Sequence, residues 1–188
     1  MTKKAVIFIA PGFEEIEALT PADVLNRAGA DVELISVTED KSVTGAHGIT
    51  IVCDRVFEGK PIEEKDIIIL PGGMPGAKNL QAHQKLGEMI KDYNKREKWI
   101  GAICAAPMIL GEMGLLEGRR ATCFTGFEKH LKGARLYPVP AITDGHIITG
   151  RGIGAAMEFA LEITSNLFGP DKAAELRERM VVPELAEK

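Results

Sequence analysis

The stretch WIGAICAAPMIL, residues 99–110, places a short apolar strand directly before an apolar helix. WIGAI (99–103) has the unbroken apolar character of a strand that is buried on both faces, and a helix is predicted over 105–113 with no loop between them. Cys104 falls at this junction. Such a turn holds its side chain up from the end of a sheet, in a nucleophile-elbow arrangement.

The same alternation of strand and helix continues on both sides of this stretch. Besides 99–103, we expect strands at 5–10, 31–37, 66–70, 120–124 and 145–150, a hairpin or sheet extension at 45–55, and helices ending near Ala28 and covering 84–95, 105–113 and 155–168. Thr20-Pro21 predicts a short turn over 14–19 and a new helix start at Pro21. The order predicts one α/β domain over residues 1–188, an open doubly wound sandwich with a parallel-rich sheet and helices on both faces. Residues 170–188 are expected to form a C-terminal helix and tail.

Composition excludes several functional classes. The chain has 188 residues, 45% hydrophobic content and a formal net charge of −4, and its basic residues are dispersed, so we expect no stable nucleic-acid complex. No apolar run approaches the roughly 18 residues of a membrane span, and the N-terminus does not resemble a signal peptide. Cys53, Cys104 and Cys123 lie far apart, which predicts free thiols in the cytoplasm and no metal site. Dinucleotide and P-loop motifs are absent from the sequence, so no cofactor is expected.

Three loops should meet beyond the carboxyl ends of the strands: 10–18, 70–77 and 102–107. Cys104, at a helix N-terminus, is the candidate nucleophile, and the helix dipole should lower its pKa. The alternative is a buried, inert cysteine. Gly72 and Gly73 could simply form a tight turn, or their backbone N–H groups could stabilise an oxyanion.

Three glutamates follow the first strand. Glu17 is the one that could turn inward and act as an acid and base beside Cys104, if burial raises its pKa. Glu14 and Glu15 are more simply explained as a solvated helix start. The four histidines, His47, His83, His130 and His146, fall on predicted loops or exposed helix positions and are expected to be mostly solvated.

Four segments together resemble the ThiJ/PfpI superfamily, within the branch of YajL and the parkinsonism-associated protein deglycase. They are PGFEEIEA followed by TPADVLNRAG, DIIILPGG followed by GAKNL, AICAAP, and GRGIGAAMEFAL, and the match spans nearly the whole chain. The resemblance implies a flavodoxin-like fold, a homodimer, Cys104 as nucleophile and Glu17 as its carboxyl partner. It also implies that the backbone of Gly72, Gly73 and Ala105 surrounds the reacting atom, that Arg151 lies beside the site, and that Cys53 lies near a dimer interface.

One position departs from the family pattern. Many relatives carry a site histidine where this chain has Phe124, beside the expected site. This puts a Cys-His-acid triad in doubt and makes an intracellular cysteine peptidase the least favoured function. The resemblance instead implies a cofactor-independent deglycase or glyoxalase that acts on α-oxoaldehydes, such as methylglyoxal and glyoxal, or on their early adducts with proteins and nucleotides. The products would be lactate or glycolate. The alternative is a redox-sensing chaperone in which Cys104 is oxidised without turnover.

Overall fold

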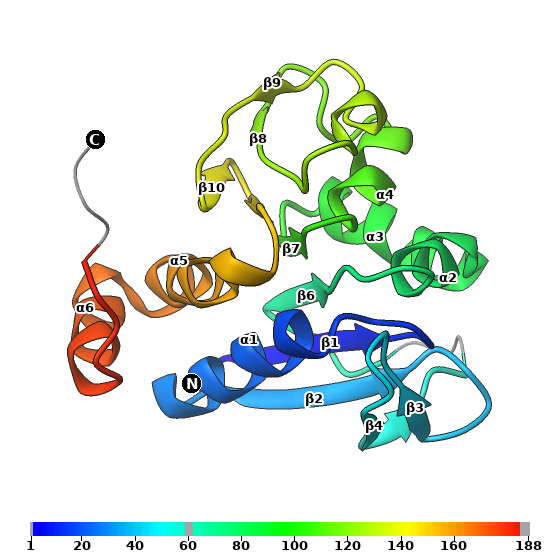
Figure 1. Ribbon diagram of the computed structural model, residues 1–188, viewed down its shortest axis with the longest axis horizontal. Helices are drawn as coiled ribbons and strands as arrows, with labels where there is room; N and C mark the ends of the chain where they lie inside the picture. The colour runs from blue at the N-terminus through cyan, green and yellow to red at the C-terminus, as the bar shows by residue number, and fades with distance from the viewer. Residues whose placement is uncertain (1, 59–61, 185–188) are drawn as a thin grey trace.

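A seven-stranded, mostly parallel sheet forms the centre of the molecule (Figure 1). The computed structural model describes residues 2–58 and 62–184. In spatial order the strands are β10 (Ala141–Asp144), β11 (Ile147–Gly150), β7 (Trp99–Ile103), β6 (Ile67–Leu70), β1 (Lys4–Ile9), β2 (Asp31–Ser36) and β5 (Arg55–Val56). All neighbours pair in parallel except β10 and β11, which pair antiparallel. The doubly wound α/β prediction is therefore confirmed.

The strand order reverses direction between β1 and β6. From β1 the chain moves outward to β2 and β5, and it then returns to β6 on the other side of β1 before continuing to β7 and β11. In open α/β sheets, ligands bind beyond the carboxyl ends of the strands at such a switch point. The loops that follow β1, β6 and β7 meet at this edge.

Helices cover both faces of the sheet. One face is covered by α1 (Glu15–Ala28) and α5 (Ala156–Phe168), and the other by α2 (Gly76–Ala82), α3 (Gln84–Lys95) and α4 (Pro107–Glu112). In β1 the side chains alternate between the two cores: Ile7 and Ile9 face the first, and Val6 and Phe8 face the second. Helix α6 (Pro170–Arg179) packs outside, against α5 and α1 (Figure 1).

The predicted break at Pro21 is wrong. Helix α1 runs without interruption from Glu15 to Ala28, with Pro21 inside it. Proline removes one backbone hydrogen bond from a helix, but Ala18, Ala22 and Leu25 around it are buried against the sheet. Tertiary packing thus outweighs the local stop signal.

Other local expectations need revision. The hairpin or sheet extension expected at 45–55 is confirmed, with different bounds: β3 (Ser42–Thr44) and β4 (Thr50–Val52) pair antiparallel as a separate two-stranded sheet, and β5 extends the main sheet. The strand expected at 120–124 is reduced to β8 (Arg120–Ala121), which pairs with β9 (Arg135–Leu136) outside the main sheet. Helix α2 and the short 3₁₀ helices η1 (Glu128–His130) and η2 (Ile153–Ala155) were not predicted.

The C-terminal helix expected from residue 170 is α6, while the end of the predicted tail, 185–188, lies outside the described residues. No helix within 2–58 and 62–184 combines the length and apolarity needed to cross a membrane.

Candidate functional site

Cys104 sits in a strained turn between β7 and α4. Its φ is 65°, in the left-handed region that non-glycine residues seldom adopt. Two backbone hydrogen bonds fix the turn: the Cys104 N–H donates to the Gly150 carbonyl at 2.9 Å, and the Ala106 N–H donates to the Ile103 carbonyl at 3.0 Å. The helix begins three residues later, at Pro107. The sheet thus presents the thiol at the switch-point edge, as an elbow does.

Glu17 is the carboxyl group that lies beside this thiol. It projects from the first turns of α1 and is 0% exposed. Its Oε2 accepts a hydrogen bond from the Gly72 N–H at 3.0 Å, whereas its buried Oε1 has no partner among the described residues. A Cβ added to Gly72 would lie 2.6 Å from Glu17 Oε2 and 2.7 Å from Cys104 Cβ. Only glycine therefore lets these three groups meet.

The surroundings of Glu17 and Cys104 favour the protonated forms of both groups. Burial raises the pKa of Glu17 from its usual 4.5 to about 7, against the lowering effect of its hydrogen bond to Cys104. Burial, and then the neighbouring Glu17 carboxylate, raise the pKa of the Cys104 thiol. The expectation that a helix dipole lowers this pKa is wrong. Helix α4 has six residues and starts beyond the sulfur, so its dipole is short and displaced, while desolvation of the buried thiolate is large.

The glycine loop after β6 contributes differently from the expectation. The Gly73 and Ala105 N–H groups hydrogen-bond the sulfur and favour its anionic form. The Gly72 N–H is instead committed to Glu17 and is not free for an oxyanion. At Gly73 φ is 83° and a Cβ would lie 2.4 Å from the Glu14 backbone nitrogen, so the loop packs directly onto the start of α1.

Glu14 and Glu15 are buried, at 7% and 5% exposure, so the expectation of a solvated helix start is wrong. Glu15 accepts a hydrogen bond from the His47 N–H at 2.9 Å and lies 3.0 Å from His47 Nδ1, which ties the loop after β3 to α1 and lowers the pKa of Glu15. The ligand atoms of Glu14, Glu15 and His47 lie within 4.8 Å of one another, close enough to hold a cation. His47 is 32 residues from Glu15, so no sequence spacing indicated this cluster.

None of the four histidines lies against Cys104, because each has another partner. His47 pairs with Glu15, His83 accepts the Leu86 N–H at the start of α3, His130 pairs with Glu112, and His146 contacts Asn94. His146 is also buried, contrary to expectation.

Phe124 is hydrogen-bonded to the elbow, and Arg151 follows Gly150, whose carbonyl accepts the Cys104 N–H. The Phe124 N–H donates to the Cys104 carbonyl at 2.8 Å, and Arg151 follows β11 and donates from Nη1 to the Pro138 carbonyl at 2.8 Å.

The other two thiols differ from Cys104. Burial raises the pKa of both Cys53 and Cys123 to about 11, and neither contacts a buried carboxyl partner of its own in the described chain.

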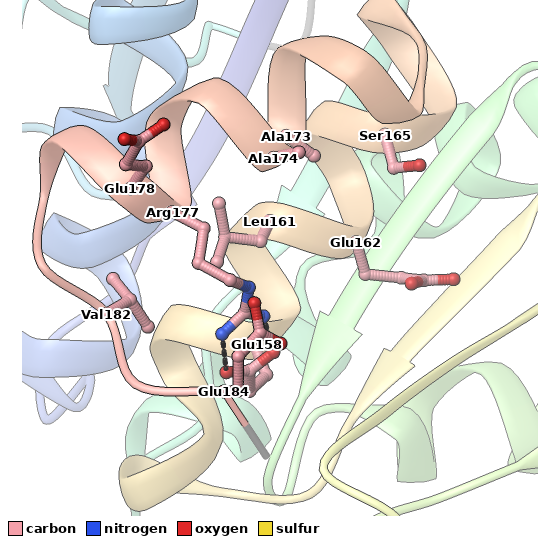
Figure 2. A pocket seen from close by; sticks show the side chains of 10 residues that line it. All are labelled: Glu158, Leu161, Glu162, Ser165, Ala173, Ala174, Arg177, Glu178, Val182 and Glu184. Atoms are coloured by element: carbon pink, nitrogen blue, oxygen red, sulfur yellow. Dashed lines mark hydrogen bonds and ion pairs between the residues drawn. The ribbon is translucent and has the colours of Figure 1, made fainter.

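Two sizeable cavities flank helix α5. One, of about 770 Å³, is lined by Phe124, Arg151 and Gly152 and borders the elbow. The other, of about 650 Å³, lies between α5, α6 and the segment that follows (Figure 2). There Arg177 pairs with Glu158 and donates to the Pro183 carbonyl at 2.8 Å. The ten labelled residues of this second cavity include no cysteine or histidine, so it is not the candidate active site.

Known proteins match most of this chain. The model of the DJ-1/PfpI family matches residues 3–166. Over 183 residues the chain is 39% identical to Protein DJ-1 homolog B of Arabidopsis thaliana, covering 96% of this chain but 42% of that protein, and it covers 45% of homolog A. The chain thus spans less than half the length of these two relatives. It is 37% identical over 177 residues to the glutathione-independent glyoxalase DJR-1.2 of Caenorhabditis elegans, covering 93% of this chain and 94% of that one.

Solved structures agree with this match. The structure of oxidized Toxoplasma gondii DJ-1 superposes with a TM-score of 0.93 at 30% identity, covering 97% of this chain and all of that one, 100%.

Proposed function

Because the chain belongs to the DJ-1/PfpI family, we propose that it is a cysteine-dependent enzyme that converts α-oxoaldehydes, or their early adducts on proteins and nucleotides, to 2-hydroxy acids. The observation that carries the proposal is the buried contact between Glu17 and the strained Cys104 elbow. A relative named as a glyoxalase, 37% identical to this chain, supports the class of reaction.

The first step is attack of the sulfur on the aldehyde carbon. Since burial raises the thiol pKa, the thiolate is not preformed, and Glu17 takes the proton as the carbon–sulfur bond forms. A pKa of about 7 leaves the carboxyl partly ionised at neutral pH, so it serves first as base and then as acid. Protonation of the resulting oxyanion gives a hemithioacetal.

The second step moves one proton between the two adjacent carbons. Glu17 removes the proton from the former aldehyde carbon and returns it to the neighbouring carbonyl carbon through an enediol, while the hydroxyl proton passes to the former ketone oxygen. The result is a thioester of a 2-hydroxy acid on Cys104. The N–H groups of Gly73 and Ala105, which hydrogen-bond the sulfur, are the backbone donors that we assign to the developing charge. Water then cleaves the thioester, so the sum is α-oxoaldehyde plus water giving the 2-hydroxy acid, with the thiol regenerated and no cofactor consumed.

The decisive experiment compares wild type with Cys104→Ser in metal-free, glutathione-free buffer. Wild type should form many equivalents of lactate per chain from methylglyoxal, and Cys104→Ser should form none above the buffer rate. Cys123→Ser is the matched control, because it removes a buried thiol that has no carboxyl partner of this kind. Full activity in Cys104→Ser would refute the mechanism.

The second candidate is a redox sensor or redox-regulated chaperone. It is favoured by the same two N–H groups, which suit a sulfinate oxygen, and by protonated Glu17, which can donate to another. An oxidized relative has been solved. Mild peroxide should then add about 32 Da to wild type but not to Cys104→Ser. An unchanged mass in wild type would count against this function. A peptidase is disfavoured because Phe124 stands where the family resemblance places a histidine, and all four histidines are engaged elsewhere.

We further propose a cytoplasmic homodimer. Three free cysteines suit a reducing compartment. Exposed apolar side chains lie on α1 (Ile16 and Leu19), in the turn before β4 (Ile49) and on β4 (Val52), and Cys53 is buried next to Val52. Light scattering after gel filtration should give twice the mass of one chain for wild type, and the mass of a single chain for Val52→Asp.

A further inference from the structure

The cavity that borders the Cys104 elbow is mainly apolar. Its volume is about 770 Å³, and the loop before β10, the turn after β8 and the residues after β11 form it. The apolar lining comes from Phe124, Pro138, Val139, Pro140, Ile153 and Ala155. Phe124 and Ile153 are 43% and 39% exposed although both are large and apolar. Exposing such side chains to water is unfavourable in free energy, and an apolar ligand that covers them relieves this.

This cavity adjoins the reactive sulfur through Gly152. A Cβ built on Gly152 would lie 3.0 Å from the Phe124 ring and 4.0 Å from Cys104 Sγ. The ring and the sulfur therefore lie on the same side of the Gly152 backbone. The Phe124 N–H, bonded to the Cys104 carbonyl, fixes this wall to the elbow. Cys104 itself is not among the lining residues, so a molecule bonded to the sulfur would reach this wall past Gly152.

The size and polarity of the cavity indicate what those atoms are. The methyl group of methylglyoxal contacts only a small part of such a space, and glyoxal has no substituent at all. A phenyl ring or a branched aliphatic group fills it and buries far more apolar surface. A pocket that gains contact with each added carbon discriminates through kcat/KM.

We propose that this cavity is the substituent-binding subsite, and that the preferred α-oxoaldehydes carry a large apolar, especially aromatic, group next to the ketone. The reaction itself rests on the function proposed above, whereas the binding of the substituent does not depend on turnover.

Binding is tested with products in the Cys104→Ser full-length chain. Calorimetric titration should show that mandelate, which carries a phenyl ring, binds at least about tenfold more tightly than lactate, which carries a methyl group. Gly154→Leu should remove this preference, because the space around the Gly154 Cβ position is open and leucine would fill the cavity. Ile153→Ser should reduce it by removing an apolar wall. Val181→Ser, which changes an exposed apolar residue outside the cavity, should preserve it.

Turnover is tested with phenylglyoxal and methylglyoxal in the corresponding chains that keep Cys104. The ratio of their kcat/KM values should fall at least about tenfold in Gly154→Leu. Equal binding of mandelate and lactate to Cys104→Ser, or a preference that survives both cavity variants, would overturn the subsite. If neither aldehyde is converted but mandelate is preferred, the proposed reaction fails and the subsite stands.

Discussion

Two parts of the sheet bury ionisable groups in opposite ways. Near its amino end, Lys65 is buried with only 4% of its side chain exposed, and it lies 3.0 Å from Glu33, which also binds Arg55. The Arg55 hydrogen bonds, ahead of those from Lys65, lower the pKa of Glu33. At the carboxyl end, Glu17 is fully buried with no cation beside it among the described residues, and its pKa rises to about 7.

The difference shows that burial by itself does not decide the role of a charged residue. At the amino end Glu33 has two oppositely charged partners, Arg55 and Lys65, which favour its charged form. At the carboxyl end the partner is a thiol, and one carboxylate oxygen has none. Such a group holds a proton that it can give up near neutral pH, which is what acid and base catalysis needs.

Replacing one carboxyl group in each region tests the comparison. The largest effect is expected at Glu17, where activity should fall without a loss of stability. Glu17→Gln should lower kcat/KM for α-oxoaldehydes by about 10²- to 10⁴-fold, because the amide cannot accept the thiol proton. The melting temperature at pH 8 should not fall, since the amide removes the cost of a buried, unpaired carboxylate. Steady-state kinetics and thermal melts on the same preparation measure both. A large loss of stability together with retained kcat/KM would reverse the assignment of this region.

Glu33→Gln is the matched substitution at the amino end. The free energy of unfolding should fall by about 3 kcal/mol, because the buried Lys65 side chain loses the carboxylate that pairs with it. Turnover of α-oxoaldehydes by the folded variant should stay close to wild type. Denaturant unfolding measures the loss, and the double variant Glu33→Gln with Lys65→Met should recover part of it. A neutral effect of Glu33→Gln would mean that the ion pair contributes nothing, and the contrast between the two regions would weaken.

The pH dependence of stability should also differ in sign between the two regions. Folding raises the pKa of Glu17 from 4.5 to about 7. The contribution of Glu17 to the free energy of unfolding is therefore fully present below pH 4.5 and is lost as the pH rises through 7. The shift corresponds to about 3 kcal/mol. Glu33, whose pKa is lowered, contributes stability above its usual pKa that is lost as pH falls. The difference in unfolding free energy between wild type and Glu17→Gln, measured from pH 4.5 to 8, isolates the contribution of Glu17. A chelator in the buffer keeps metal ions from affecting the result. A flat difference would show that Glu17 is not shifted.

The sequence predicted the fold because its strands carry unbroken apolar segments and its helices lie between them. It also predicted which loops meet, since consecutive parallel strands bring their carboxyl ends to one edge. The predicted helix start at Pro21 was wrong, because local propensity competes with packing that exists only in the folded chain. The minor strands β8 and β9 are two residues long, too short for a periodic pattern.

The roles within the site were less predictable. Side-chain types identified Cys104 and Glu17 as candidates, but the direction of the thiol pKa depends on desolvation, which no local motif encodes. The pairing of Glu15 with His47 joins residues that are 32 apart in the chain. The sequence alone does not distinguish a Gly72 N–H that is bonded to Glu17 from one that is free to stabilise an oxyanion.

The smallest expected effect comes from the glycine that joins the two site groups. A methyl group on Gly72 would lie 2.6 Å from Glu17 Oε2 and 2.7 Å from Cys104 Cβ, so one of them must move. Gly72→Ala should therefore lower the free energy of unfolding by about 1 to 3 kcal/mol and reduce kcat as the carboxyl leaves the thiol. Gly87→Ala in α3 is the control. Its Cβ would meet only the flexible end of Met113 at 3.2 Å, so it should leave kcat unchanged and stabilise the helix by about 0.5 to 1 kcal/mol. Denaturant unfolding and steady-state kinetics on both variants provide the comparison. If Gly72→Ala kept full kcat, the carboxyl and thiol would not need this close approach, and the distinction between the catalytic and structural regions would have to rest on charge alone.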